Sequence, residues 1–546
     1  MPLLNVRDLT IGLDSHTALV REVGFHVEPG ATLAVVGESG SGKSLSLLAV
    51  LGLLPSEMRV QGEIVFDDLP LHTFTANQKR QLRGAQIGYV SQDPLSNLHP
   101  LKSVGRQVEE AILAHQRMRR RALRARVVAL LDEVGIRDAA RRYHDRPAAF
   151  SGGQRQRVMI AIAIALNPKL IIADEPTTAL DATVQASILR LLKRLQQQHS
   201  CALVFISHNL RVVADIADRI VVMQQGRIVE QGTTSALFSA PAHEYTRSLL
   251  QAGWHPRSSS PVGGGEDKPL LEVHQASRRF AKAARWWSRA PTAPVLDDVS
   301  FTLHEGEILG LVGESGSGKT TLGRIVVGLD RADSGHLTFA GQPWRTPGSH
   351  HPARHAVQMV FQDPYSSLNP RRRIDDTLAQ PLQLTALREQ GQPLSPTALR
   401  TAVAELLEQV ELPASLASRY PSQLSGGQRQ RVVIARALAM KPRLIVADEA
   451  VSALDITTQH RIITLFSRLR ERYGLSILFI SHDLAAGAAL CDRVLVLQSG
   501  RIIEQGRTEQ IFQQPQQPWT RQLLAAIPGR AWLETEELRY DAAIAL

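Results

Sequence analysis

The chain has 546 residues, too many for one ordinary hydrophobic core, so two or more domains are expected. A hydrophobic content of 44% and a charged content of 21% are typical of a globular protein and exclude a disordered or fibrous chain. The two cysteines, Cys201 and Cys491, are too few for a disulfide framework, a zinc site or an iron–sulfur cluster. The formal net charge of +10 comes mostly from scattered arginines, so no nucleic-acid partner is expected.

Neither the N-terminus nor the apolar segments predict a secreted or membrane-spanning chain. The opening residues, MPLLNVRDLT, lack the charged and apolar regions of a secretory signal. The most apolar run, Val158 to Leu166, is much shorter than the roughly 20 residues of a membrane-spanning helix. We therefore expect a cytoplasmic protein. The densest basic stretch, Arg117 to Arg126, leads into apolar residues at helical spacing and predicts a solvated amphipathic helix.

A series of short motifs occurs twice in the same order. GESGSGK at Gly37 to Lys43 returns at Gly313 to Lys319, and SGGQRQRV, ADE and ISH each recur further along at one constant offset. Such an internal repeat indicates that one domain has been duplicated. We expect a first domain over 1–253, a linker rich in Pro, Gly and Ser over 254–269, and a second domain over 270–546. Within the second domain, residues 282–294 are expected to form a loop.

In each half, an apolar run typical of a buried strand feeds a glycine-rich loop that is followed by a helical pattern. The glycines would let backbone N–H groups curl around phosphate oxygens at a helix N-terminus. The lysine would hold the β- and γ-phosphates of ATP, and the hydroxyl residue after it would ligate Mg²⁺. The expected ATP-binding residues are Gly37, Ser39, Gly40, Gly42, Lys43 and Ser44 in the first half and Gly313, Ser315, Gly316, Gly318, Lys319 and Thr320 in the second.

Downstream in each half, a buried-strand pattern ends in two carboxylates, LIIADE at Leu170 to Glu175 and LIVADE at Leu444 to Glu449. Successive side chains of a strand point in different directions, so the two carboxylates can serve different roles. Asp174 and Asp448 suit the Mg²⁺ shell, whereas Glu175 and Glu449 can orient or deprotonate the attacking water. An acidic pair at a strand end is by itself more often a helix cap or a surface loop, but its pairing with a phosphate-binding loop favours the catalytic interpretation.

Two further segments, FSGGQ at Phe150 to Gln154 and LSGGQ at Leu424 to Gln428, resemble the signature of the ATP-binding cassette (ABC) proteins. Both continue into QRV and an Ala-rich helical pattern, and the resemblance covers both halves almost end to end. It implies an α/β architecture with the P-loop NTPase (ABC ATPase) fold in two tandem copies. Each copy is then expected to have a RecA-like core, an antiparallel β subdomain and a helical signature subdomain.

The resemblance also implies roles for residues outside the phosphate-binding loops. His208 and His482 would be switch histidines near the γ-phosphate, and Asp181 and Asp455 would close the D-loops. In this family the signature of one domain completes the ATP site of the other, which would pair Lys43 with the second signature and Lys319 with the first. The remaining expected contacts are the glutamines Gln92 and Gln362 at Mg²⁺ and nucleotide, and Ser151, Gly153, Gln154, Ser425, Gly427 and Gln428 at nucleotide.

Segments outside the catalytic core resemble those of dipeptide and oligopeptide uptake ATPases. They are SQDPLSNLHP at Ser91 to Pro100, FQDPYSSLNP at Phe361 to Pro370, and the tails at Ala240 to Leu250 and Gln514 to Pro528. The resemblance implies an importer subunit, peripheral at the cytoplasmic face of the inner membrane. Its partners would be two permease subunits and an extracytoplasmic solute-binding protein. Peptides are the first expected cargo, and peptide-like antibiotics, glutathione and nickel complexes are the next candidates.

Two other classes of tandem cassette are alternatives to an importer subunit. One is a cassette that acts on ribosomes. Cassettes of that class usually have a long charged inter-domain helix and an Asn-His D-loop, whereas here the linker is short and the D-loops read TTALD and VSALD. A DNA-repair cassette would need inserted zinc-binding cysteines, which two cysteines exclude.

The sequence departs from the family pattern at Phe150, Ala450 and Asn209, none of which removes a catalytic group. No aromatic residue is assigned to adenine stacking, for which Phe280 is a weak candidate. Because the docking groove for the permeases is expected beside Gln92 and Gln362, we expect docking residues just past these glutamines, at Ser96, Leu98, Ser367 and Leu368.

Overall fold

The computed structural model describes residues 1–13, 18–178, 180–252, 268–280, 294–344, 354–452 and 454–529. They form two compact units, one built mainly on Met1–Trp254 and the other mainly on His255–Leu454 and Thr458–Ile527. Most of the predicted linker, residues 254–267, and residues 282–293 of the predicted loop lie outside the described residues. Pro269, the last residue of the predicted linker, is the first residue of a strand.

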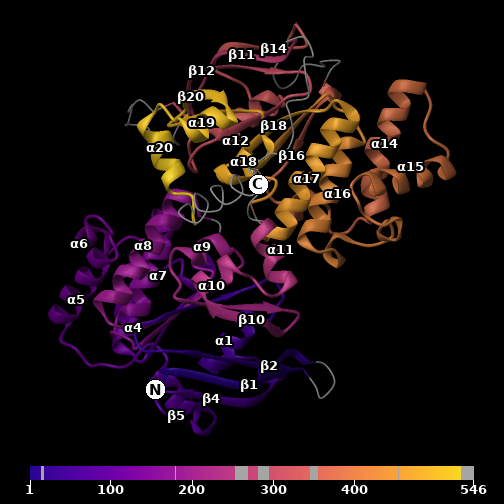
Figure 1. The fold of residues 1–546 in the computed structure, drawn as a ribbon. Helices are drawn as coiled ribbons and strands as arrows, with labels where there is room; N and C mark the ends of the chain where they lie inside the picture. The colour runs from indigo at the N-terminus through magenta and orange to yellow at the C-terminus, as the bar shows by residue number, and fades with distance from the viewer. Residues whose placement is uncertain are drawn as a thin grey trace, which may run out of the picture. The chain divides into compact units, whose positions relative to one another are not determined.

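The first unit contains two sheets (Figure 1). The smaller one is antiparallel, with strand order β2-β1-β4-β5, and the core sheet has the order β10-β9-β3-β8-β7-β6. The core strands run parallel except for β10, which pairs antiparallel with β9. The strands are β1 (Leu4–Gly12), β2 (Ala18–Val27), β3 (Thr32–Val36), β4 (Arg59–Phe66), β5 (Leu69–Pro70), β6 (Ile87–Val90), β7 (Leu170–Asp174), β8 (Ala202–Ser207), β9 (Arg219–Gln224) and β10 (Arg227–Thr233).

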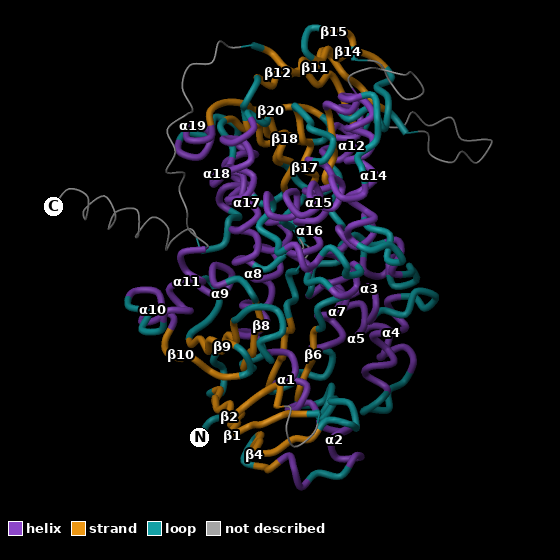
Figure 2. Tube along the Cα trace, turned by 90° about the vertical axis from the view of Figure 1, so that its right-hand side faces the viewer, coloured by secondary structure: helices purple, strands orange, loops and turns teal. Residues whose placement is uncertain are grey.

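Four helices of the first unit lie together. Figure 2 shows α3, α4, α5 and α7 gathered on one side of the core sheet, away from β1, β2 and β4. The helices are α1 (Lys43–Leu51), α2 (Ala76–Leu82), α3 (Pro94–Asn97), α4 (Val104–Leu113), α5 (Arg120–Glu133), α6 (Ala139–Arg142), α7 (Gly152–Ile164), α8 (Ala182–Gln198), α9 (Leu210–Ala214), α10 (Thr234–Ser239) and α11 (Glu244–Ala252).

The second unit repeats this plan, with an antiparallel sheet in the order β12-β11-β14-β15 and a core sheet in the order β20-β19-β13-β18-β17-β16. Its strands are β11 (Pro269–Arg278), β12 (Leu296–His304), β13 (Ile308–Val312), β14 (Ser334–Phe339), β15 (Gln342–Pro343), β16 (Val357–Val360), β17 (Leu444–Asp448), β18 (Ser476–Ser481), β19 (Arg493–Gln498) and β20 (Arg501–Arg507). Its helices are α12 (Lys319–Val326), α13 (Pro364–Ser367), α14 (Ile374–Gln390), α15 (Pro396–Gln409), α16 (Gly426–Leu438), α17 (Ile456–Tyr473), α18 (Leu484–Leu490), α19 (Thr508–Gln513) and α20 (Pro518–Ala525).

The core strands are buried on both faces, which explains their continuous apolar sequences. Along β3, Ala34 and Val36 pack into the cluster shared with the signature helix α7, whereas Leu33 and Val35 pack toward the antiparallel sheet. The predicted duplicated α/β fold, with an antiparallel β subdomain and a helical subdomain, is confirmed. The predicted amphipathic helix is α5, and it buries its apolar side. Within the described part of the chain, no helix combines the length and apolar character that crossing a bilayer requires.

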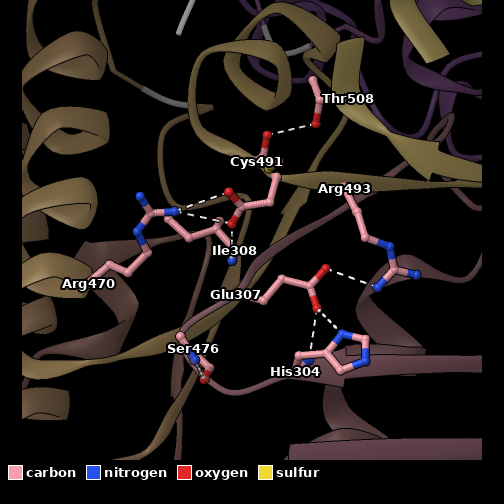
Figure 3. A network of polar contacts seen from close by, with 10 residues as sticks. His304, Glu307, Ile308, Arg470, Ser476, Cys491, Arg493 and Thr508 are labelled. Atoms are coloured by element: carbon pink, nitrogen blue, oxygen red, sulfur yellow. Dashed lines mark hydrogen bonds and ion pairs between the residues drawn. The ribbon is translucent and has the colours of Figure 1, made fainter. Parts of the chain in front are cut away.

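A polar network in the second unit joins the N-terminal ends of β13 and β19 to α17 (Figure 3). The buried Arg470 on α17 donates to both carboxylate oxygens of Asp492 at 3.2 Å, and Asp492 accepts the backbone N–H of Ile308 at 2.8 Å. Beside it, the Glu307 carboxylate lies between the imidazole of His304 and the guanidinium of Arg493, at 3.0 Å from each. These contacts fix the start of the strand that leads to the second phosphate-binding loop.

The first unit makes only part of this network. Asp218 accepts the backbone N–H of Thr32 at 2.8 Å, as Asp492 accepts that of Ile308. Gln196 occupies the position of Arg470 and donates instead to the carbonyl of Gly30. The first unit therefore lacks the arginine–aspartate pair at this position.

Arg470→Ala should destabilise the second unit by roughly 3 kcal/mol, because removing one partner of a buried ion pair leaves the other charge uncompensated. Gln196→Ala is the matched control, and it should cost about 1 kcal/mol because a single neutral hydrogen bond is lost. Thermal unfolding of the two variants followed by calorimetry would measure the difference. Equal losses of stability in the two variants would show that the ion pair contributes no more than the amide does.

Candidate functional site

Each phosphate-binding loop joins the first strand of a core parallel sheet to a buried helix, β3 to α1 and β13 to α12. Gly42 and Gly318 stand directly before these helices with φ of 97° and 110°, a left-handed conformation that favours glycine. Gly37 allows a close approach, because a Cβ there would lie 2.1 Å from the carbonyl oxygen of Met223 on β9. Ser39, Gly40, Ser315 and Gly316 lie exposed at the tips of the loops.

The predicted phosphate-binding lysines are buried inside their own loops. Lys43 Nζ donates to the carbonyls of Gly37 and Glu38, both at 2.7 Å. Lys319 Nζ makes the matching bonds to Gly313 and Glu314 at 2.8 Å. Burial lowers the pKa of Lys43, and the nearby carboxylates of Glu175 and Asp174 oppose that shift. The loops thus hold an ammonium group on carbonyl oxygens at the point where the sequence predicts phosphate.

Two of the three predicted metal ligands in each half, the hydroxyl residue and the aspartate, are in direct contact. Ser44 Oγ donates to Asp174 Oδ1 at 3.0 Å, and Thr320 Oγ1 donates to Asp448 Oδ1 at 3.2 Å. Burial raises the pKa of Asp174 and raises that of Asp448 to about 6. These hydroxyl and carboxylate groups are the hard oxygen ligands that Mg²⁺ prefers.

A glutamate lies at the centre of each group of predicted catalytic residues. Glu175 Oε2 accepts from Gln92 Nε2 at 3.1 Å and lies 3.1 Å from His208 Nδ1. In the second half, Gln362 Nε2 donates to Glu449 Oε2 at 2.7 Å, and His482 Nδ1 lies 3.3 Å from Glu449 Oε1. In each half the structure therefore brings together three predicted residues from three separate segments.

Burial alone would raise the pKa of Glu175 and Glu449, but contacts with His208 and His482 lower it in each half. Both glutamates are therefore ionised at neutral pH. Their backbones have φ of 45° and 48°, a conformation that is sparsely populated for residues other than glycine. Strained backbone of this kind concentrates at functional sites, where the surrounding structure holds it in place.

The signature segments open helices α7 and α16. The hydroxyls of Ser151 and Ser425 cap these helices by accepting the backbone N–H groups of Gln154 and Gln428. In return, the side-chain oxygens of these glutamines accept the backbone N–H groups of the two serines. Gly153 and Gly427 are needed for packing, because a Cβ at these positions would lie 2.3 Å from Val184 and 2.4 Å from Thr458.

The structure explains why Phe150 can replace the usual leucine of the signature. Phe150 is buried, and the guanidinium of Arg142 lies over its ring, 3.9 Å from the centroid. Arg142 also donates to the Gln154 side chain and to the carbonyl of Ala149. In the second half, Leu416 takes the place of Arg142 and lies in one apolar cluster with Leu424. Asn209 caps α9 as Asp483 caps α18, so this departure keeps the local structure.

Sequence reasoning missed two contacts that occur only in the first half. Tyr89 donates its hydroxyl to Asp174 at 3.4 Å, and Thr178 donates to Glu175 at 2.9 Å. Met359 and Ser452 occupy these positions in the second half, and the Ser452 hydroxyl bonds to the backbone of Glu449. A comparison of the two halves residue by residue would have singled out both positions. The weak adenine candidate, Phe280, packs against the guanidinium of Arg278 at 4.9 Å.

A glycine-rich loop between a parallel strand and a helix, with a carboxylate pair at the end of another parallel strand of the same sheet, defines the class of P-loop NTPases. Comparison with protein families is more specific. The model described as ABC transporter matches residues 20–178 and 296–452. The model described as oligopeptide/dipeptide transporter, C-terminal region, matches residues 229–278 and 503–539. Both models thus match twice, once in each half.

Relatives resemble the chain over nearly its whole length. The uncharacterized ABC transporter ATP-binding protein YejF of Escherichia coli is 43% identical, over 96% of this chain and 99% of the relative. The glutathione import ATP-binding protein GsiA of Escherichia coli is 42% identical, over 94% and 86%. The peptidoglycan transport ATP-binding protein YejF of Agrobacterium fabrum is 41% identical, over 98% of each. The chain therefore belongs to the ABC transporter family, as an ATP-binding protein with two fused cassettes, and it is an ATPase.

Changing Glu175 and Glu449 together to glutamine should leave ATP binding intact, because the lysine, hydroxyl and aspartate groups around each loop remain. ATP hydrolysis should fall by at least about a hundredfold, the usual contribution of a general base. Phosphate release and binding of a fluorescent ATP analogue would measure the two effects, with Glu57→Gln on the surface as the control. Hydrolysis near the parent rate in the double variant would contradict the predicted role of these glutamates.

Proposed function

We propose that the chain is the ATP-hydrolysing subunit of an importer for peptides or peptide-like solutes such as glutathione. The observation that carries the proposal is the match of both halves to the C-terminal region of oligopeptide/dipeptide transporters. The names of GsiA and of the Agrobacterium YejF, which refer to import of glutathione and to transport of peptidoglycan, support the same class of cargo. Neither comparison favours the alternative of a ribosome-acting cassette.

In this proposal each cassette binds one MgATP. Backbone N–H groups of the loop and Lys43 or Lys319 bind the phosphates, and the signature residues contribute donors to the nucleotide. Mg²⁺ fits the oxygen atoms of Ser44 and Asp174, and of Thr320 and Asp448, with Gln92 and Gln362 as further ligands. When bound, Mg²⁺ neutralises charge that develops on the phosphates.

Hydrolysis follows from the glutamate-centred groups. Glu175 and Glu449 are ionised, so each can orient a water and take its proton as the water attacks the γ-phosphate. His208 and His482 contact these glutamates and would lie near the γ-phosphate. The domains proposed to carry the two sites are residues 1–253 and 270–546, with a linker over 254–269.

The chain would act through partners, two permease subunits and an extracytoplasmic solute-binding protein, from the cytoplasmic face of the inner membrane. The segments that follow Gln92 and Gln362 are proposed to contact the permeases. These glutamines bond the catalytic glutamates at one end of the segment, and the short helices α3 and α13 follow immediately. A change at the nucleotide can therefore move the proposed docking segment.

The residues first expected to dock require a correction. Leu98 and Leu368 are only 1% and 2% exposed and belong to the apolar cores of their units. Both leucines close the turn after a short helix, where the chain folds back into the core. Exposed apolar side chains close behind the two glutamines include Leu95, at 63%, and Tyr365, at 52%. They are better candidates for a docking contact, beside Ser96 and Ser367.

In the second unit the docking segment is tied to the signature helix α16. The guanidinium of Arg429 lies 5.1 Å from the ring centroid of Tyr365, and Arg436 donates to the carbonyl of Ser367 at 2.5 Å. Arg429 directly follows the signature glutamine Gln428. If nucleotide binding moves the signature helix, these two contacts can therefore move the docking segment with it.

Leu95→Asp together with Tyr365→Asp should keep the fold and ATP binding, because both side chains are exposed, while the complex with the permeases is lost. We expect at least about a tenfold drop in permease recovered on copurification and in ATPase activity stimulated by peptide-loaded binding protein, as for interface anchors. Leu69→Asp, an equally exposed change on β5, is the control. Normal assembly and peptide uptake in the double variant would contradict the docking assignment, and uptake of no peptide by the parent complex would contradict the proposed cargo.

A further inference from the structure

Helix α11, which follows the last strands of the first unit, is fixed at its start by a glutamate. Glu230 on β10 accepts the backbone N–H groups of Ala242 at 2.8 Å and His243 at 3.0 Å. Thr246 is completely buried, and Leu249 packs into the same apolar cluster as the signature helix. The position of α11 relative to the core sheet is therefore well defined.

From this helix, Tyr245 reaches the phosphate-binding loop. Its side chain is buried, and its hydroxyl oxygen accepts the backbone N–H of Glu38 at 3.0 Å. Glu38 is the second residue of the loop, and its carbonyl accepts a bond from Lys43 Nζ at 2.7 Å. One residue of the loop is thus bonded to Tyr245 through its N–H and to Lys43 through its carbonyl. Burial raises the pKa of Tyr245 to about 12, so the phenol is neutral at physiological pH.

The second unit has the same helix start but a different residue at this position. Glu504 on β20 accepts the backbone N–H groups of Gln516 at 2.7 Å and Gln517 at 3.1 Å, and the buried Thr520 corresponds to Thr246. Trp519 stands where the first unit has Tyr245. An indole carries one N–H donor and no acceptor, so Trp519 cannot accept the N–H of Glu314. The two loops are therefore supported by different contacts.

We propose that Tyr245 is a positioning residue for the first ATP site, acting through Glu38, and that the second site lacks this support. The inference rests on the proposed role of Lys43 and its loop in ATP binding. Without the hydroxyl, the N–H of Glu38 must find another partner, and the loop loses a contact that holds it in the conformation presented to phosphate. ATP binding must then restore that conformation, which lowers affinity at the first site alone.

The test uses full-length chains in which one site is disabled, so that the other is measured. Lys319→Ala leaves the first site and Lys43→Ala leaves the second. In the first background, Tyr245→Phe should weaken binding of MgATP about fivefold to tenfold, as expected for one hydrogen bond lost from a preorganised loop. Tyr245→Trp, which copies the second unit, should weaken it at least as much. Trp519→Phe in the second background is the matched control and should change the affinity less than about twofold.

Binding is measured by titration calorimetry, and the unfolding temperature without nucleotide is measured alongside. Weaker binding in Tyr245→Phe with an unchanged control supports the inference, because a purely structural tyrosine would alter the unfolding temperature and leave the affinity at the parent value. Equal affinity of Tyr245→Phe and its parent would overturn it. Failure of the Lys319→Ala parent to bind ATP at all would instead refute the proposed role of the first loop.

Discussion

The strand order of each core sheet is the constraint on which both candidate sites depend. In the first unit β3, β8, β7 and β6 are neighbours in that order, and they run parallel. Their carboxyl ends therefore meet at one edge, where β3 delivers the phosphate-binding loop and β7 delivers Asp174 and Glu175. His208 follows β8 and Gln92 follows β6. Residues far apart in the sequence thus come within hydrogen-bonding distance of one another.

The same edge concentrates charge in a buried setting, which the local contacts balance. Lys43 is held on two carbonyl oxygens, Asp174 accepts a hydroxyl hydrogen, and Glu175 is paired with His208. On binding, phosphate oxygens would replace the carbonyl partners of Lys43, and Mg²⁺ would replace the hydroxyl hydrogen at Asp174. This exchange of partners is the chemical basis of the proposed binding step.

Much of the fold could be predicted from the sequence, because the repeated motifs fix local structure in both halves. The apolar runs before Gly37 and Gly313 and before Asp174 and Asp448 are strands, as predicted. The burial of the Leu98 side chain could not be predicted, because the local sequence after the QDP turn does not determine whether a leucine faces solvent or the core. Only the packing of α3 against the helical subdomain decides between the two.

Supporting contacts outside the recognised motifs were also beyond prediction. Tyr245 lies in a tail recognised only by similarity, and nothing local indicates that its hydroxyl reaches Glu38. The same holds for Arg142, whose contact with Phe150 depends on how α6 folds over the signature. Such supporting residues differ between the halves, whereas the groups expected to touch nucleotide are the same. The duplicated cassettes thus retain one chemistry while their surrounding contacts have diverged.

The most direct test of the two proposed ATP sites is a structure of the Glu175→Gln, Glu449→Gln chain with MgATP. One nucleotide is expected on each loop, with Lys43 and Lys319 moved from the loop carbonyls to phosphate oxygens and with Mg²⁺ at the hydroxyls of Ser44 and Thr320. Nucleotide bound elsewhere, or lysines still on the carbonyls beside bound ATP, would contradict the proposed sites.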